Sequence, residues 1–214
     1  TILRRSITVK QRIKLFRYFI STLAVSMACS MVSFAQVTAP AANKAMAAQA
    51  TANKAMEEWR AKMIVDWTRA KEYTKEYLDA MPEDGTNYKP NAQDKDQRTF
   101  AEQMLHFTAA NFTFASLATG ATNPYQGKNL EKMDEYKTKA ALSKIVLEGY
   151  DFMIAAVKNF DLSKAGEPLK LFNRFDSTRS GVIAAAFEHQ THHRGQATVY
   201  IRMKGVKPPQ ERLF

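Results

Sequence analysis

The stretch that decides the fold and the site reads Glu188-His189-Gln190-Thr191-His192-His193-Arg194-Gly195-Gln196, and it holds three of the chain's four histidines. Within it, His189 and His193 are four positions apart. Side chains at this spacing on an α-helix lie on one face about a turn apart, so both imidazoles could reach one point. Neutral imidazole is a good ligand for zinc, nickel, copper or iron, and a third ligand would have to come from another segment.

The remaining histidine, His106, lies in a second helix-like segment, residues 97–118. It lies about 120° from the centre of that segment's apolar stripe, but the segment is apolar nearly all round, which indicates burial. We therefore expect a metal site formed by His106, His189 and His193. Two alternatives stay open: paired histidines also occur by chance on solvated helix faces, and a core histidine can bond a backbone carbonyl.

Apolar side chains recur at helical spacing in four segments of the chain. Only eight glycines and seven prolines occur in 214 residues, and they cluster between these segments, which favours long helices over short strands. The sequence therefore predicts an all-α fold, a four-helix bundle, with helices over residues 57–80, 97–118, 131–159 and 178–204.

The connections between the predicted helices differ in length. Residues 120–129 form a long loop for neighbouring antiparallel helices, so this connection could cross over and leave the second and third helices parallel. Residues 160–176 predict an irregular link or a short hairpin. Gly205 predicts a left-handed cap after the last helix, and the Pro208-Pro209 pair prevents the helix from restarting.

The N-terminal part of the chain predicts export. Residues 1–35 combine a basic region, an apolar run of about 15 residues and the small residues Ser33 and Ala35, the pattern of a cleaved signal peptide. An uncleaved membrane anchor is the alternative, but the run is shorter than the roughly 20 residues that span a bilayer. A faint lipoprotein pattern leaves lipidation of Cys29 open. Residues 36–56 are Ala-rich and predict a spacer or a helical extension of the first core helix.

The charge of +10 belongs largely to this leader. Residues 1–35 hold six basic residues and no acid, so removing the leader lowers the net charge to +4. That value gives no strong electrostatic case for binding nucleic acid. Cys29, the only cysteine, also lies in the leader, so the mature chain would have no disulfide, thiolate ligand or cysteine nucleophile. After cleavage we expect no stable membrane association.

The histidine-rich stretch, followed by Tyr200-Ile201-Arg202, Gly205 and Pro208-Pro209, resembles the C-terminal signature of the DinB-like family. These DNA-damage-inducible four-helix proteins are related to the YfiT-like metal-dependent hydrolases. The resemblance extends over residues 57–209 and includes three upstream motifs: Met81-Pro82-Glu83, Lys89-Pro90 and Phe100-Ala101-Glu102-Gln103-Met104-Leu105-His106.

The resemblance implies an up-down-down-up four-helix bundle over residues 57–214, in agreement with the predicted crossover. It also implies a divalent metal, nickel or zinc, held by three histidines that correspond to His106, His189 and His193. His192 is expected to flank this site, although it could substitute as a ligand. The resemblance further implies that Gly195 allows close helix packing and that Arg194 and Gln196 hold hydrogen bonds around the site or between helices.

The implied function is that of a metal-dependent enzyme, a hydrolase or thiol S-transferase with an unknown small-molecule substrate. Three histidines leave metal positions open, the pattern of catalytic sites. Glu102 and Glu188 are the nearest acids in sequence and are candidate general bases, although Glu188 could equally be a solvated surface residue. Export to the periplasm or medium argues against common cytosolic thiols as substrates. A non-catalytic metal-binding or stress-related bundle protein is the alternative function, and a homodimer is compatible with the family.

Overall fold

The computed structural model describes residues 39–213. Four α-helices account for most of them: α2 (Ala39–Ala80), α3 (Phe100–Thr119), α4 (Lys139–Lys158) and α5 (Arg179–Met203). The all-α prediction is confirmed. Two compact units divide the chain, Thr1–Ala50 and Thr51–Phe214. In the first unit the described residues belong to the N-terminal turns of α2, whose side chains are mostly exposed.

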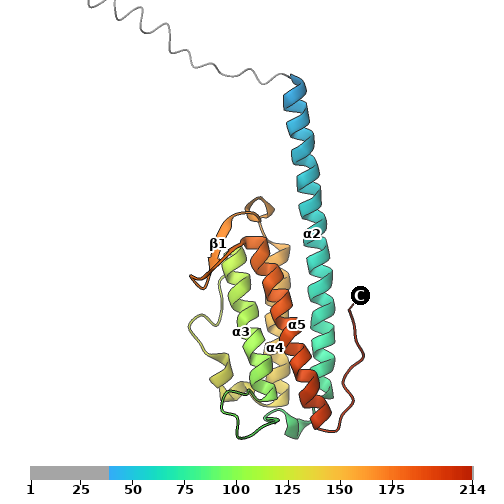
Figure 1. Ribbon diagram of the computed structural model, residues 1–214, viewed down its shortest axis with the longest axis vertical. Helices are drawn as coiled ribbons and strands as arrows, with labels where there is room; N and C mark the ends of the chain where they lie inside the picture. Colours follow the sequence, from blue (N-terminus) through green and yellow to red (C-terminus); the bar gives the residue numbers. More distant parts are fainter. Residues whose placement is uncertain (1–38, 214) are drawn as a thin grey trace, which may run out of the picture. The chain divides into compact units, whose positions relative to one another are not determined.

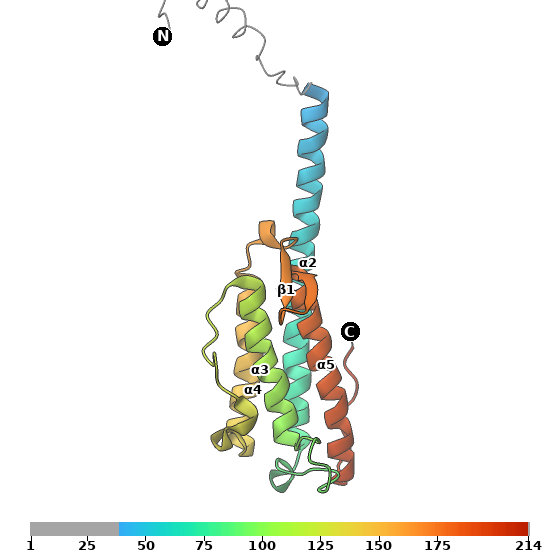
Figure 2. The same ribbon diagram turned by 60° about the vertical axis from the view of Figure 1, so that its left-hand side comes forward.

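The helices of the second unit form a four-helix bundle of the predicted topology (Figure 1). The α2 segment of this unit and α5 run in one direction, and α3 and α4 run in the other. Figure 2 shows α3 and α4 side by side and parallel, and the connection from Gly120 to Thr138 returns along the outside of this helix pair to the start of α4. The crossover expected from the length of this loop is therefore confirmed.

Aromatic packing and a buried polar chain join the helices of this bundle. Trp67 on α2 is fully buried, and its ring lies edge-on to Tyr150 on α4 with centroids 5.8 Å apart. The hydroxyl of Tyr150 bonds Thr74 on α2 at 2.7 Å and Gln190 on α5 at 2.8 Å. Because the hydroxyls of Thr74 and Tyr150 and the amide oxygen of Gln190 bond one another, the bundle can bury these three polar groups without a large desolvation cost.

The starts of α3 and α4 differ from the predicted ones. α3 begins at Phe100 rather than at residue 97, because Thr99 and Glu102 form a capping box that satisfies the first free backbone N–H groups. α4 begins at Lys139 rather than at residue 131. Two 3-10 turns, Leu130–Lys132 and Asp134–Tyr136, precede it, and an extended residue separates them.

The link between α4 and α5 contains a short hairpin, which was one of its two predicted forms. Strand β1 (Pro168–Leu171) pairs antiparallel with β2 (Phe175–Thr178). Thr178 then caps the N-terminus of α5 through a hydrogen bond from the Gly181 N–H. After α5, Gly205 has φ 75°, as predicted for a left-handed cap.

Two predictions about the N-terminal part have different outcomes. The α2 helix begins at Ala39, so the Ala-rich segment from residue 39 to 56 is helical, in keeping with the high helix propensity of alanine. The predicted signal peptide, residues 1–35, lies outside the described residues. Within residues 39–213, every helix is too short or too polar to cross a bilayer.

Candidate metal centre

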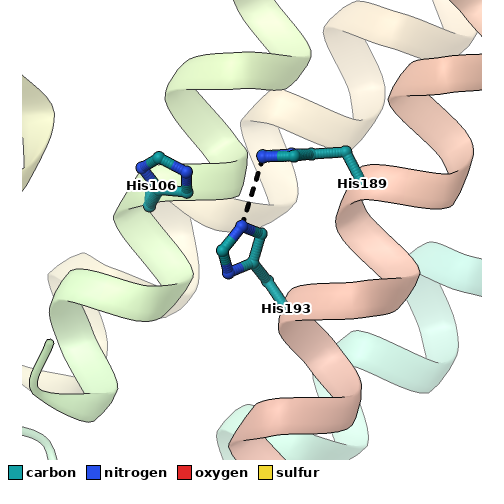
Figure 3. Close-up of side chains that lie close together, drawn as sticks. All are labelled: His106, His189 and His193. Atoms are coloured by element: carbon teal, nitrogen blue, oxygen red, sulfur yellow. Dashed lines mark hydrogen bonds between the residues drawn. The ribbon is translucent and has the colours of Figure 1, made fainter. Parts of the chain in front are cut away.

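Neighbouring helices α3 and α5 bring the three predicted histidines together. His106 comes from α3, and His189 and His193 come from successive turns of α5 (Figure 3). One ring nitrogen from each histidine lies within 4.8 Å of the other two. The ring centroids are 4.5 to 5.2 Å apart. His106 and His189, which are 83 positions apart in the sequence, therefore lie close together. The prediction from helical spacing that His189 and His193 share one face of a helix is confirmed.

His193 is the most buried of the three, with 6% of its surface exposed. Its Nδ1 atom lies 2.8 Å from the amide oxygen Oε1 of Gln103, which can only accept a hydrogen bond. The ring proton of neutral His193 therefore sits on Nδ1, and Nε2 keeps its lone pair. That Nε2 atom faces Nε2 of His189 at 3.2 Å.

His106 has a carboxylate partner from outside the regular helices. Its Nδ1 atom lies 2.7 Å from Oε1 of Glu131 in the 3-10 turn before α4. Arg98 donates from Nε to the other oxygen of the same carboxylate at 2.7 Å. Burial raises the pKa of Glu131, but the hydrogen bonds from His106 and Arg98 outweigh burial and hold that pKa at about 2. Glu131 is therefore ionised and orients the His106 ring through Nδ1.

His189 and His193, the members of the cluster on α5, are neutral at physiological pH. Burial, followed by the nearby charge of His106, lowers the pKa of His189 to about 4. Burial, followed by the charges of His189 and His106, lowers the pKa of His193 to about 3. Neutral imidazole is the form that binds a metal ion, so these rings need not lose a proton first.

The arrangement of hydrogen-bond partners fits a metal ion. His106 and His193 each use Nδ1 on an oxygen acceptor, which leaves Nε2 of both rings without an oxygen partner, and Nε2 of His193 meets only Nε2 of His189. Metal-binding histidines are commonly oriented in this way by a carboxylate or a carbonyl on the far nitrogen. His189 has a buried Nδ1 with no hydrogen-bond partner, so its ring is held by the contact of its Nε2 with His193 and by packing, including edge-on contact with Phe114. The three histidines could hold a divalent metal, whose identity their chemistry leaves open.

The other residues of the histidine-rich stretch have varied roles. His192 is exposed and bonds Gln196 at 3.1 Å, so it flanks the cluster as expected. Arg194 is buried, bonds Gln190 and Thr74, and lies over the Tyr73 ring at 4.6 Å, which supports the expected interhelical role. The expectation for Gly195 is wrong, because it is exposed and a Cβ there would meet nothing within 4 Å.

Neither acid selected from the sequence contacts the cluster. Glu102 bonds the Thr99 N–H in the capping box of α3, and its second oxygen lies 3.5 Å from Lys132 Nζ. Glu188 is exposed on α5. Glu131, which sequence reasoning missed, is 25 positions from His106 and lies in an irregular segment, so helical periodicity gives no signal for it.

A cavity of about 530 Å³ lies beside the cluster, between the N-terminal end of α3 and the C-terminal half of α5. Most of the residues that line it have polar side chains, and they include His193 and His192 but not His106 or His189. Gln103, the partner of His193, also lines it, so the cavity borders the cluster on the Nδ1 side of His193.

A four-helix bundle with three convergent histidines on two neighbouring helices defines a class of candidate metal-binding helical proteins. The sequence model of the DinB family matches residues 46–212, and the chain belongs to the DinB family. Two crystal structures of DinB-like proteins share the fold. The one from Bacillus subtilis is 20% identical with a TM-score of 0.54, and the alignment covers 72% of this chain and 96% of that one. The one from Bacillus cereus is 16% identical with a TM-score of 0.54, and the alignment covers 70% of this chain and 95% of that one. A comparison with curated proteins found no match.

Proposed function

We propose that this protein is a metal-dependent hydrolase that binds one divalent ion, nickel or zinc, through His106, His189 and His193. The observation that carries the proposal is the convergence of three imidazole nitrogens within 4.8 Å, two of them on rings fixed through Nδ1. Structural zinc sites close with four protein ligands, whereas three leave a position open to water or substrate. A site of three histidines therefore favours catalysis over a structural role.

The exposure of the cluster supports an accessible site. His193 is buried, but 29% of the His106 side chain is exposed and His189 is partly exposed. When bound, a divalent ion supplies Lewis-acid chemistry, polarising a carbonyl or phosphoryl oxygen and lowering the pKa of water. A small-molecule substrate could reach such a site from solvent.

The surrounding residues orient the ligands and are not proton carriers. Glu131 bonds both His106 and Arg98, and its pKa of about 2 makes it a poor general base near neutral pH. Gln103 fixes the ring of His193 and carries no charge. Glu102 is occupied in the helix cap. If a divalent ion is held by the three histidines, these residues would orient its ligands, and none of them is placed to act as a separate carboxylate base.

Hydrolysis is favoured over thiol transfer by the proposed location. We propose that residues 1–35 direct export to the periplasm or the medium, where common cytosolic thiols are scarce. Fractionation of cells that express the full chain, followed by N-terminal sequencing of the exported form, tests the location. A protein retained in the cytoplasm with residues 1–35 intact would contradict export and restore a cytosolic thiol as a candidate substrate.

The metal content of the purified protein tests the function. We expect about one divalent ion per chain by elemental analysis, and loss of the ion in His106→Ala, His189→Ala and His193→Ala. His192→Ala is the matched control, because this exposed histidine lies on the same helix outside the cluster. The absence of bound metal in the unchanged protein, even after incubation with zinc or nickel, would contradict the proposal. Retained metal without exchangeable water would instead favour a non-catalytic protein.

A further inference from the structure

An aromatic pair connects the histidine cluster to the β1–β2 hairpin. The Phe114 ring on α3 lies edge-on to His189, with centroids 5.8 Å apart and planes at 82°. The Phe172 ring, in the turn between β1 and β2, lies 5.8 Å from Phe114. A residue of the hairpin is therefore only one side chain away from a candidate metal ligand.

The turn that carries Phe172 has a strained backbone. Phe172 has φ 52° and Asn173 has φ 55°, both in the left-handed region. Asparagine tolerates this region, but a bulky phenylalanine rarely adopts it. Burial does not compensate, because 61% of Phe172 remains exposed. The hydrogen bond from the Arg174 N–H to the Leu171 carbonyl makes these two residues the centre of a hairpin turn, which requires left-handed φ at both, so the turn itself imposes the conformation on Phe172.

The base of the hairpin is anchored to the bundle, so its turn has a defined position. Arg179 bonds Glu167 through Nε at 2.8 Å and the Ala118 carbonyl at the end of α3 through Nη1 at 3.1 Å. Across the strands, Lys170 and Asp176 form an ion pair at 3.1 Å in the observed register. These contacts hold Phe172 over α3 beside Phe114.

The aromatic pair of Phe114 and Phe172 lies next to His189, a member of the histidine cluster that does not line the neighbouring cavity. The cavity of about 530 Å³ is lined by His193 but not by His106 or His189. The latter two are the partly exposed members of the cluster, and His189 is the one that contacts Phe114. His189 therefore has an apolar neighbour, the Phe114 ring, which is only 6% exposed and in turn contacts the exposed ring of Phe172.

We propose that the exposed ring of Phe172, supported from beneath by the buried ring of Phe114, forms an apolar subsite that selects substrates with an aromatic or bulky aliphatic group next to the group that reaches the histidines. The inference rests on the proposed metal function and adds the class of substrate. An exposed phenylalanine held in a strained turn, one ring away from a candidate ligand, fits a ring-shaped group. Edge-on and offset contacts between aromatic rings add affinity beyond the area they bury.

Two hydroxamates that share one metal-binding group test the subsite. Benzohydroxamate carries a phenyl ring where acetohydroxamate carries a methyl group. We expect the zinc-loaded protein to bind benzohydroxamate at least about fivefold more tightly in calorimetric titration, in line with one aromatic contact. Phe172→Ala should remove most of this preference, Phe172→Leu should keep part of it, and the zinc content should be unchanged in both.

Phe175→Ala is the matched control. Phe175 belongs to the same hairpin and is 53% exposed, but its ring stacks with Arg174 rather than with Phe114. We expect this variant to keep the preference for benzohydroxamate. Loss of the preference in Phe175→Ala as well would overturn the assignment to Phe172, because it would show a general effect of the hairpin.

The remaining outcomes separate the subsite from the metal function. Equal affinities of the two hydroxamates for the unchanged, zinc-loaded protein overturn the subsite and leave the metal function intact. Retained zinc with neither probe bound also overturns the subsite. Failure to retain zinc overturns the metal function and the subsite together. A dimer in sedimentation equilibrium that Phe172→Ala dissociates, without any probe preference, assigns the surface to a second copy and overturns the subsite.

Discussion

The Nδ1 atom of His106 lies 2.7 Å from Oε1 of Glu131, a carboxylate that Arg98 holds from its other oxygen. The contact joins α3 to the irregular segment before α4. A carboxylate on the far nitrogen fixes the ring and makes the free nitrogen a stronger ligand. Glu131 thus acts on the candidate metal centre through His106 without being one of the three convergent groups.

Replacing Glu131 with Gln should weaken metal binding about 10- to 100-fold, because the charge that orients His106 is lost. Competition between the protein and a zinc indicator dye measures the change. Glu135→Gln is the control, since Glu135 is an exposed acid four residues along the same segment. An unchanged zinc affinity in Glu131→Gln would show that the contact does not influence the site.

Two helical glycines should respond to alanine in opposite directions. At Gly149 on α4, an added Cβ would lie 2.8 Å from Thr108 Cγ2 on α3, so Gly149→Ala should lower the free energy of unfolding by about 1 kcal/mol after the gain in helix propensity. At exposed Gly195 an added Cβ would meet nothing within 4 Å, so Gly195→Ala should raise the free energy of unfolding by about 1 kcal/mol through its higher helix propensity. Urea denaturation measures both. Equal shifts of the same sign would contradict the close approach of α3 and α4.

Thr99→Ala should lower the free energy of unfolding by about 1 kcal/mol, because the Thr99 hydroxyl accepts a hydrogen bond from the Glu102 N–H at the start of α3. Thermal and urea unfolding report the loss. Thr122→Ala, in an exposed loop, should leave stability within about 0.5 kcal/mol of the unchanged protein. An unchanged free energy of unfolding in Thr99→Ala would mean that another group caps the helix.

The metal-free protein should lose stability as the pH falls from about 7 to 5. In the folded protein the pKa of His193 is about 3 and that of His189 is about 4, whereas an unperturbed histidine has a pKa of about 6.5. Because these pKa values are lowered, the unfolded chain takes up protons first. The stability is therefore constant above 6.5 and declines below it, with a slope that approaches about 1 kcal/mol per pH unit for each histidine.

Urea denaturation at several pH values measures this slope. His193→Asn should reduce it, because one of the two groups with a lowered pKa is removed. His192→Asn, which replaces an exposed histidine on the same helix, should reduce it less, because burial is the largest cause of both lowered pKa values and the charge of His192 is a smaller one. A slope that is the same in all three proteins would show that burial of His193 does not govern acid stability. The lowered pKa of Glu131 adds a further loss only below about 4.5.

Local sequence patterns were sufficient to predict the helices of the bundle and the three histidines of the candidate metal site. Helical periodicity predicted the four helices, loop length predicted the crossover, and Gly205 predicted the end of α5. The spacing of His189 and His193 placed them on one face, because an α-helix repeats every 3.6 residues whatever surrounds it. His106 was found by elimination among four histidines, which works only because the chain has so few.

The tertiary structure decided everything that depends on contacts between distant segments. The start of α4 at Lys139 follows from Leu130, which is fully buried, and from the cap at Thr138; helical periodicity alone continued the helix back to residue 131. The partners of the histidines, Glu131 and Gln103, were also beyond the reach of sequence reasoning. Hydrogen bonds between helices depend on the packing of whole segments, and spacing along one chain carries no record of that packing. The sequence thus specified which residues could bind a metal, and only the folded chain showed which residues orient them.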